Sequence, residues 1–484
     1  MPLALIPAPT HLEECEGAPF RFGPGTRLIA PPELDGVAGF VWAVLGPLAT
    51  VTRDDGAADA VVLRPDGGTG EAYTLTVDAD RVVVAGSPAG IARGVATLAQ
   101  VSGLGTEGAP SGVVPALVIR DEPRYERRGL MVDVVRHFYP VSTLERVIDL
   151  LAAYKLNVLH LHLTDDQGWR IEVPGRPELV ERSGRTQCGD GEAGWLRTEE
   201  YTRLVEYAAA RHIEVVPELD VPGHVNAALH ADGSLSPSGQ PTEAYTGADV
   251  GFSKLDLSLP ATAPFLADVL GHLADLTPGR YLHIGGDEVH RMPREEYLGF
   301  LDHVSGAVAA TGKSLIAWQE AAAAGLPSDA LVQLWDSNAD PAPVVAAAQR
   351  GIGVVLSPGK HVYLDMKYDA DHPLGQDWAG TVDVRQSYEW DPDTYLPELP
   401  ATAVRGVEAA IWTEFIATED ELFSMLLPRL VAIAELAWSP QRSRSWESFA
   451  PRLAAHAPLW TAAGVAFHES EQVWGRGRTD VAVA

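Results

Sequence analysis

Two carboxylates stand side by side in the segment LHIGGDEVH, where they directly follow a pair of glycines and a short apolar run. They are Asp287 and Glu288. A helix cap needs only one acceptor, whereas two neighbouring carboxylates in a pocket raise the pKa of at least one of them. A carboxyl group with a raised pKa is what general acid catalysis requires near neutral pH. The segment therefore predicts a pair of catalytic carboxyl groups.

Further polar and aromatic residues follow other short apolar runs along the chain. They are Asp133, Arg136, Asp165, Asp166, Glu218, Asp220, His224, Trp318, Trp335, Trp412 and Glu414. Charged groups can bind sugar hydroxyls through two hydrogen bonds, and indole faces pack on the C–H surfaces of pyranose rings. A phosphate site would contain more cations than this set provides. The composition of the set therefore predicts a carbohydrate site.

Several of these residues have a plainer alternative. Asp165, Asp166 and Asp220 could be N-caps of the helices that follow them, and a tryptophan at a strand end often packs in the core. His160 and His162 form an H-x-H pair on one face of a strand, which leaves a metal-dependent hydrolase as a second class of function. The two histidines could instead fill the interior of the fold with satisfied hydrogen bonds. Metal analysis of the purified protein separates these classes.

The apolar runs alternate with amphipathic helical patterns from Arg128 onward, which is typical of βα units and a parallel sheet. Eight runs can be counted, namely GLMVDV, NVLHLHL, IEVVPEL, RYLHIGG, SLIAWQE, ALVQLWD, GVVLS and VEAAIWTE. The segments STLERVIDLLAAYK and TEEYTRLVEYAAARH between them have helical periodicity. We predict an α/β fold with a (β/α)8 TIM barrel over residues 123–484, whose site residues face one mouth. A doubly wound sheet is disfavoured because no G-x-G-x-x-G opens a helix.

The first part of the chain has a different pattern. The segment AYTLTVDADRVVVAG alternates as strands do, and GIARGVATLAQVSGL then has helical periodicity. The segment GTEGAPSGVVP, which follows, has the composition of a linker. We therefore predict a small α+β domain over residues 1–122, ahead of the barrel.

Composition excludes some classes of partner. With 484 residues, of which 46% are hydrophobic, the chain can bury a large core. Its formal charge of −30 repels phosphate backbones and anionic lipids, so neither nucleic acid nor a membrane is an expected partner. No apolar run approaches the length of a membrane-spanning helix. The sequence assigns no oligomeric state.

The cysteines and the N-terminal segment indicate the cellular compartment in which we expect the protein. Cys15 and Cys188 are far apart and fit neither a disulfide framework nor a zinc site. The opening MPLALIPAPTHLEECE lacks a basic leader, and prolines interrupt its apolar run, so it does not resemble a signal peptide. We expect a cytoplasmic protein as the sequence is written. A secreted protein whose signal had been trimmed would show the same sequence.

A set of motifs between Arg128 and Trp438 resembles the β-N-acetylhexosaminidases of glycoside hydrolase family 20. The motifs are, in order, GLMVDVVRHFYP, NVLHLHLTDDQGWRIE, VVPELDVPGHVNAAL, LHIGGDEVH, AWQE, YLDMKY, GQDWAG and IWTEF. The resemblance implies a barrel preceded by a noncatalytic α+β domain, with no metal or organic cofactor. It also implies exo-acting hydrolysis with retention of configuration, on a carbohydrate that ends in β-linked GlcNAc or GalNAc. A barrel that binds sugar without turnover is the remaining alternative.

The resemblance assigns different roles to the two adjacent carboxylates. Glu288 would be the general acid and base. Asp287 would orient the 2-acetamido group of the substrate, stabilise the positive charge on its nitrogen, and help to keep Glu288 protonated before bond cleavage. The acetamido oxygen would attack the anomeric carbon and form an oxazolinium ion, as in the substrate-assisted exceptions among glycosidases.

The resemblance also assigns the walls around the acetamido group. Tyr363 would donate its hydroxyl to the acetamido oxygen. Trp318, Trp335 and Trp412 would enclose that group, and Trp378 would cover another face of the sugar.

The remaining assignments concern the hydroxyls and the general acid. Arg136 and Glu414 would bind hydroxyls at the non-reducing end, and Asp365 would reach the hydroxymethyl end and close the pocket. Asp165 and His224 would form a polar relay behind Glu288.

Overall fold

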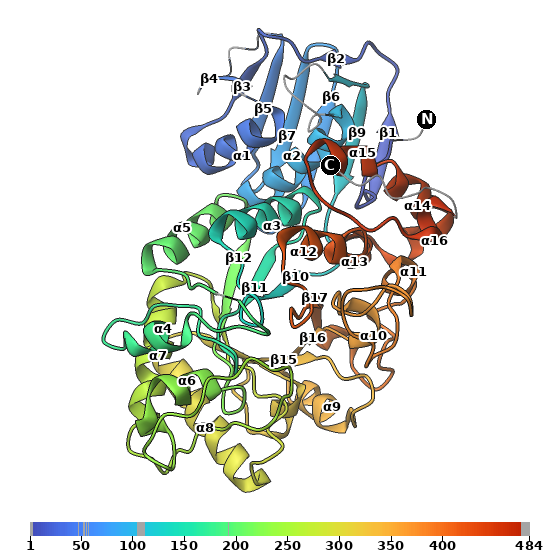
Figure 1. The fold of residues 1–484 in the computed structure, drawn as a ribbon. Helices are drawn as coiled ribbons and strands as arrows, with labels where there is room; N and C mark the ends of the chain where they lie inside the picture. The colour runs from blue at the N-terminus through green and yellow to red at the C-terminus, as the bar shows by residue number, and fades with distance from the viewer. Residues whose placement is uncertain are drawn as a thin grey trace.

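The structure is a computed structural model that describes residues 3–46, 48–51, 54, 56, 58–103, 112–191 and 193–475. Figure 1 shows a sheet with two helices at one end of the molecule, in blue, and a larger helical and stranded body below it. The boundary that we propose, between residues 122 and 123, falls in the connection from the last strand of this sheet to the first strand of the body.

The N-terminal sheet has seven strands in the order β1-β9-β6-β7-β5-β3-β4. Their bounds are β1 His11–Glu14, β3 Arg27–Ile29, β4 Ala49–Val51, β5 Ala60–Pro65, β6 Tyr73–Val77, β7 Arg81–Gly86 and β9 Leu117–Asp121. Helices α1 Asp35–Leu45 and α2 Pro88–Ser102 and the turn η1 Pro32–Leu34 complete this unit. The alternation in β6 and β7 places every second side chain in the core, so the predicted strands and helix of this region are confirmed.

The predicted linker, residues 105–115, lies outside the described residues up to position 111. Its end is not a linker, because Val113–Val114 form strand β8, which pairs with β2 Phe20–Arg21. Val113 pairs with Arg21, which lies 92 positions earlier in the sequence, so composition alone could not reveal the strand.

Eight parallel strands close into a barrel, as predicted from the eight apolar runs. They are β10 Arg127–Asp133, β11 Val158–His162, β12 Glu214–Glu218, β13 Tyr281–His283, β14 Ser314–Trp318, β15 Leu331–Leu334, β16 Gly353–Leu356 and β17 Val404–Ile411. Closure is complete because β10 pairs with both β11 and β17. The strands are buried almost throughout, which explains why they read as apolar runs rather than as alternating patterns.

Helices surround the barrel and fill the long loops at its carboxyl mouth. The longer ones are α3 Val141–Ala153, α5 Thr198–Ala209, α7 Thr262–Leu276, α8 Arg294–Ala310, α9 Ala342–Gln349, α12 Glu419–Leu426, α13 Arg429–Trp438 and α14 Trp446–Ala454. The shorter ones are α4 Glu178–Ser183, α6 Asn226–Ala231, α10 Gly359–Val362, α11 Val384–Tyr388, α15 Ala457–Ala462 and α16 Glu471–Trp474, with turns η2 Gly233–Leu235, η3 Gln319–Ala323, η4 Ala401–Ala403 and η5 Gln441–Ser443. In the described ranges, no helix combines the length and the apolar character needed to cross a bilayer.

Buried ion pairs fix the N-terminal sheet to the barrel. Nζ of Lys155 lies 2.8 Å from Oδ2 of Asp121, and the indole of Trp438 donates to the same oxygen at 3.0 Å. Glu71 accepts from Arg128 at 2.7 Å. Because Arg128 is the second residue of β10 and Lys155 precedes β11, these contacts lie at the amino end of the barrel, away from the mouth.

Candidate active site

The turn after β13 carries the two adjacent carboxylates, and its backbone explains the preceding glycines. Gly285, Gly286 and Glu288 have φ values of 65°, 98° and 50°, in the left-handed region. A Cβ at Gly285 would lie 1.8 Å from Oδ1 of Asp220, so only glycine fits there. A left-handed Glu288 is uncommon for a residue with a side chain, and such strain concentrates at functional sites.

Asp287 and Glu288 differ in their surroundings. The side chain of Asp287 is 9% exposed, whereas that of Glu288 is 27% exposed. Burial raises the pKa of Asp287 to about 6; His224 opposes this shift, and the charges of Glu288 and Glu218 add to it. The raised pKa that adjacency predicts is therefore found at Asp287.

Both carboxylates line a cavity of about 420 Å³ at the carboxyl mouth of the barrel. The predicted site residues that line it are Arg136, His224, Asp287, Glu288, Trp335, Tyr363, Trp378, Trp412 and Glu414. They come from the loops that follow six of the eight barrel strands, which is how this fold builds its sites. A cavity of this size accommodates one small ligand rather than a long chain.

Aromatic side chains form one wall of the cavity. The rings of Trp335 and Tyr363 are nearly parallel, with centroids 6.3 Å apart and planes 13° apart. Trp378 meets both of them edge-on at 5.7 Å, and Trp412 lies 6.5 Å from Tyr363. Trp378 is 43% exposed, so it stands at the rim, whereas Tyr363 is buried.

The structure places three predicted residues behind the lining rather than in it. Trp318 is wholly buried, and its ring centroid lies 6.0 Å from that of Trp412. Asp365 is also buried, and neither of its carboxyl oxygens has a hydrogen-bond partner among the described residues. Asp165 lies beneath Arg136 and His224. Trp318 thus supports a wall that Trp412 presents to the cavity.

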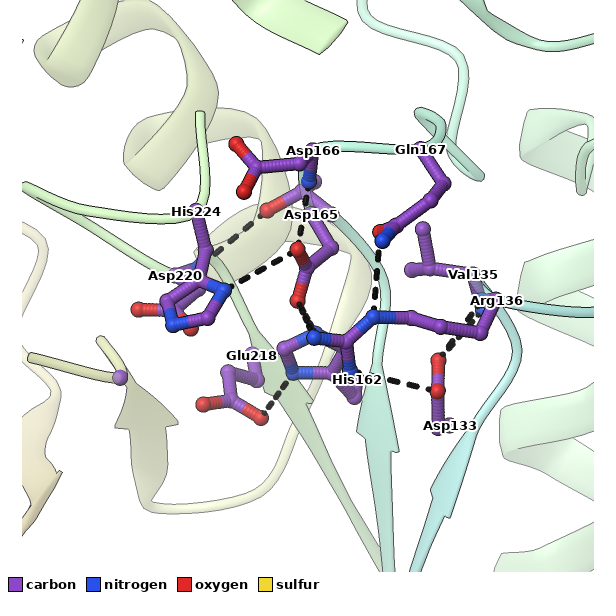
Figure 2. A network of polar contacts seen from close by, with 12 residues as sticks. Asp133, Val135, Arg136, His162, Asp165, Asp166, Gln167, Glu218, Asp220 and His224 are labelled. Atoms are coloured by element: carbon purple, nitrogen blue, oxygen red, sulfur yellow. Dashed lines mark hydrogen bonds and ion pairs between the residues drawn. The ribbon is translucent and has the colours of Figure 1, made fainter. Parts of the chain in front are cut away.

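A chain of charged side chains leads from Arg136 to Glu288 (Figure 2 shows its first part). Nη2 of Arg136 lies 2.8 Å from Oδ2 of Asp165, whose Oδ1 lies 3.1 Å from Nδ1 of His224. Nε2 of His224 lies 3.5 Å from Oε2 of Glu288. Burial acts to raise the pKa of Asp165, but Arg136 and His224 outweigh it and hold that pKa well below its usual range. Asp165 is therefore a buried anion that orients both neighbours.

His162 and Glu218 extend this network into the barrel interior (Figure 2). Nε2 of His162 lies 2.8 Å from Oδ2 of Asp165, and its Nδ1 lies 2.7 Å from Oε2 of Glu218. The indole of Trp318 donates to the other oxygen of Glu218 at 3.0 Å. Glu218 thus connects the network around Asp165 to Trp318. The sequence did not predict this connection.

Among the aspartates with an alternative assignment as helix caps, only Asp166 contacts a helix start. Its Oδ1 accepts the backbone N–H of Asn226, the first residue of α6, at 2.9 Å. Asp220 instead accepts the N–H of Gly286 at 3.1 Å, and Asp165 belongs to the relay. Asn226 begins α6 rather than α4, the helix that follows Asp166, and neither helix has a side-chain cap, so the cap assignment is wrong for all three aspartates.

His160, Glu218 and His283 approach one another closely enough to surround a cation. Their side chains are wholly buried. Nδ1 of His160 lies 2.8 Å from Oε1 of Glu408, and Nδ1 of His283 accepts the N–H of Gly285 at 3.0 Å. Both Nδ1 atoms are engaged within the protein, and Nε2 of His160 lies 3.0 Å from Oε2 of Glu218, an arrangement that fits a barrel core held by polar contacts.

Comparison with known proteins agrees with this geometry. The sequence matches the catalytic domain of glycosyl hydrolase family 20 over residues 125–297 and 290–441, and domain 2 of that family over residues 3–122. The chain belongs to glycosyl hydrolase family 20. It is 49% identical to a β-N-acetylhexosaminidase of Cellulomonas fimi, with 97% of each chain covered.

Solved structures of family 20 also superpose on the whole chain. The β-N-acetylhexosaminidase of Streptomyces coelicolor A3(2) is 42% identical, has a TM-score of 0.92, and is matched over 98% of this chain and 99% of its own. A mutant β-hexosaminidase of Streptomyces plicatus in complex with its product GlcNAc has the same identity and TM-score, with 98% of each chain covered.

Five further residues line the cavity of this family 20 protein and were not foreseen. They are Ala248, Val250, Asp336, Asn338 and Gln376. Asp336 and Asn338 lie one and three positions after Trp335, and Gln376 lies two positions before Trp378, so position after a strand or within a motif could have indicated them. Ala248 and Val250 lie in the long loop between β12 and β13, where no sequence signal marks them.

Arg136 is expected to lose function when it is replaced by lysine, although the charge is kept. Its guanidinium contacts Asp165 at 2.8 Å and lies 3.9 Å from Glu414, so it is fixed with its planar group beside the cavity. A lysine ammonium cannot reproduce that planar fork. Loss of one charged hydrogen bond to substrate lowers kcat/KM by roughly 10- to 100-fold, about 1.5–3 kcal/mol. An unchanged kcat/KM for Arg136→Lys would remove Arg136 from the substrate site.

Proposed function

We propose that this pocket removes one terminal, non-reducing, β-linked GlcNAc or GalNAc residue from oligosaccharides or glycoconjugates, with retention of configuration. The chain is a family 20 β-N-acetylhexosaminidase, and the pocket is where that activity resides. The observation that carries the proposal is the juxtaposition of Asp287 and Glu288 on one strained turn, in a cavity with an aromatic wall.

In the proposed reaction, Glu288 donates a proton to the glycosidic oxygen as the bond from that oxygen to the anomeric carbon breaks. The acetamido oxygen of the same sugar forms a new bond to the anomeric carbon from the opposite face. Asp287 stabilises the positive charge that develops on the acetamido nitrogen. Glu288 then takes a proton from water, which opens the oxazolinium ion and restores the β-configuration.

Two buried carboxyl groups support the proposal that the pocket binds the non-reducing end of the substrate, as an exo-acting enzyme must. Asp365 and Glu414 have carboxyl oxygens without a hydrogen-bond partner among the described residues, and burial raises the pKa of both. Arg136 lies beside Glu414. Because buried polar oxygens need a hydrogen-bond partner, we assign Arg136 and Glu414, which line the cavity, to the non-reducing-end hydroxyls, and Asp365, which lies behind that lining, to the hydroxymethyl group.

The relay of Asp165 and His224 is assigned to the support of Glu288, the proposed general acid. Asp165 and Asp220 raise the pKa of His224 well above its usual range in spite of burial. A protonated His224 that lies 3.5 Å from Glu288 fixes the orientation of that side chain and compensates the charge left on it after proton donation. The N-terminal unit, residues 1–122, contributes no residue to the lining of the cavity as far as the chain is described, which supports a noncatalytic role.

One assay tests the acetamido-dependent mechanism. The protein is expected to release p-nitrophenol from the β-N-acetylglucosaminide at least about 10³-fold faster, in kcat/KM, than from the plain β-glucoside, because only the first substrate carries the nucleophile. The assay is run with and without a chelator, since a metal-dependent hydrolase would lose activity with it. Comparable hydrolysis of both substrates contradicts the mechanism, and sugar binding without release from either indicates a binding-only barrel.

A further inference from the structure

Trp335 is held at three points, and each of them has a different partner. Its backbone N–H donates to Oε1 of Gln319 at 2.8 Å, and its carbonyl oxygen accepts the N–H of Gly359 at 2.9 Å. Its indole Nε1 donates to Oε2 of Glu320 at 3.2 Å. The first two contacts fix the main chain after β15, and the third acts together with the ring contacts to Tyr363 and Trp378 to fix the rotation of the indole.

Gln319 and Glu320 follow β14 directly in the AWQE motif, which places them beside the neighbouring strand end. Gln319 also accepts the N–H of Asp336 at 3.0 Å, so it clamps the start of the loop that carries Trp335. Glu320 does not line the 420 Å³ cavity. Any effect of Glu320 on the substrate therefore acts through Trp335, whose ring does line it.

A third carboxyl group beside the catalytic pair would be costly if it were ionised. Burial, followed by the charge of Asp287, raises the pKa of Glu320 to about 8. Glu320 is thus neutral at neutral pH and can accept the indole N–H without adding a negative charge beside Asp287. Because Glu320 bonds to the indole and does not line the cavity, it is placed to anchor Trp335 rather than to transfer a proton to the substrate.

We propose that Glu320 is a positioning residue that fixes the indole of Trp335 and thereby limits the length of the N-acyl group that the pocket accepts. The inference rests on the proposed function, in which Trp335 borders the acetamido group. When the hydrogen bond to Glu320 is removed, the indole can rotate about its side-chain torsions, and a longer acyl chain can enter.

The test compares kcat/KM for p-nitrophenyl β-glucosaminides that carry N-acetyl, N-propionyl or N-butanoyl groups. The wild-type enzyme is expected to prefer acetyl over propionyl by roughly 10- to 200-fold, the usual discrimination of one methylene. Glu320→Leu removes the acceptor and is expected to lower this ratio at least about fivefold. Glu320→Gln is the matched control, because its amide oxygen can still accept the indole N–H, and it is expected to keep the wild-type ratio.

A double-mutant cycle with Trp335→Phe isolates the hydrogen bond, since phenylalanine keeps a ring but lacks the donor. Trp335→Phe alone is expected to lower the acyl ratio, and Glu320→Leu in that background is expected to lower it no further. Melting temperatures of all variants separate a loss of fold from a change of selectivity, and the ratio is independent of the fraction of active enzyme.

Two results overturn the proposal. One is a folded Glu320→Leu enzyme with the wild-type ratio, and the other is a Glu320→Gln enzyme that loses selectivity as fully as the leucine variant does. If the leucine variant does not fold, Trp335→Phe decides, and an unchanged ratio there also overturns it. Failure of the proposed function is recognised separately, because the wild-type enzyme would then hydrolyse the plain β-glucoside as well as the N-acetyl substrate.

Discussion

Glu288→Gln is expected to lower kcat roughly 10²- to 10⁴-fold on substrates with poor leaving groups, which is the usual contribution of a positioned general acid. The amide occupies nearly the same volume but has no proton to transfer to the glycosidic oxygen. Glu288 is suited to this role because its side chain reaches the cavity with 27% of its surface exposed, while His224 holds it from behind at 3.5 Å.

The measurement is a leaving-group series of aryl β-N-acetylglucosaminides. Activated aryl groups need little protonation, so the loss in the variant should shrink as the pKa of the leaving phenol falls. The slope of log kcat/KM against that pKa should therefore be steeper for Glu288→Gln than for the wild type. Equal losses across the series would mean that Glu288 is not the acid.

Much of the barrel could be predicted because its strands are buried on both faces. The strand Val158–His162 pairs with a strand on each side and is buried throughout. Its residues are therefore apolar or form hydrogen bonds in the interior, and its sequence stands out as a short apolar run. The strand predicted for RYLHIGG was too long, because β13 ends at His283. The chain leaves the sheet there because Gly285 must pack against Asp220 in the left-handed conformation.

The sequence could predict which strand ends contribute residues to the candidate site, but not which of those side chains line the cavity and which lie behind it. Residues after a strand of a barrel face the mouth, which is why Asp287, Trp335 and Glu414 could be assigned to one cavity. The same rule cannot distinguish Trp412, which lines the cavity, from Trp318, which lies behind it. Depth depends on packing between strands that are distant in the sequence.

The polar interior shows the same limit. An H-x-H pair in a strand is compatible with metal ligands and with core hydrogen bonds, because alternation fixes only the face on which the side chains lie. The choice depends on Glu218 and Glu408, which come from β12 and β17 and accept from His162 and His160. No spacing along the chain reveals those partners.

Asp287→Asn is expected to lower kcat on N-acetyl substrates roughly 10²- to 10³-fold, as the loss of a preorganised electrostatic group does. The amide cannot balance the charge that develops on the acetamido nitrogen. Asp336→Asn is a control, because it removes a negative charge from the lining of the same cavity at a different strand end. Its loss should be much smaller than that of Asp287→Asn.

The charge on Asp287 also predicts that kcat/KM declines at acid pH. Since its pKa is raised to about 6, Asp287 is an anion above that pH and becomes neutral below it. The stabilisation of the positive intermediate is therefore present above about pH 6 and is lost as the pH falls through that value. The profile of kcat/KM against pH for the free enzyme should decline on the acid side in the wild type, and Asp287→Asn should show no such decline.

The nature of the intermediate gives the sharpest test of this assignment. Asp287 and Glu288 are joined by one peptide, with Cα atoms about 3.8 Å apart, so they cannot grip the glycosidic bond from opposite faces of the ring as a nucleophile and an acid must. A thiazoline analogue of the oxazolinium ion is expected to bind at least about 10²-fold more tightly than N-acetylglucosamine, and Asp287→Asn should weaken that preference. The first-formed product should be the β-anomer. A sugar ester on any carboxylate in intact-mass measurements during turnover, or an α-anomer as first product, would exclude substrate-assisted catalysis in this protein.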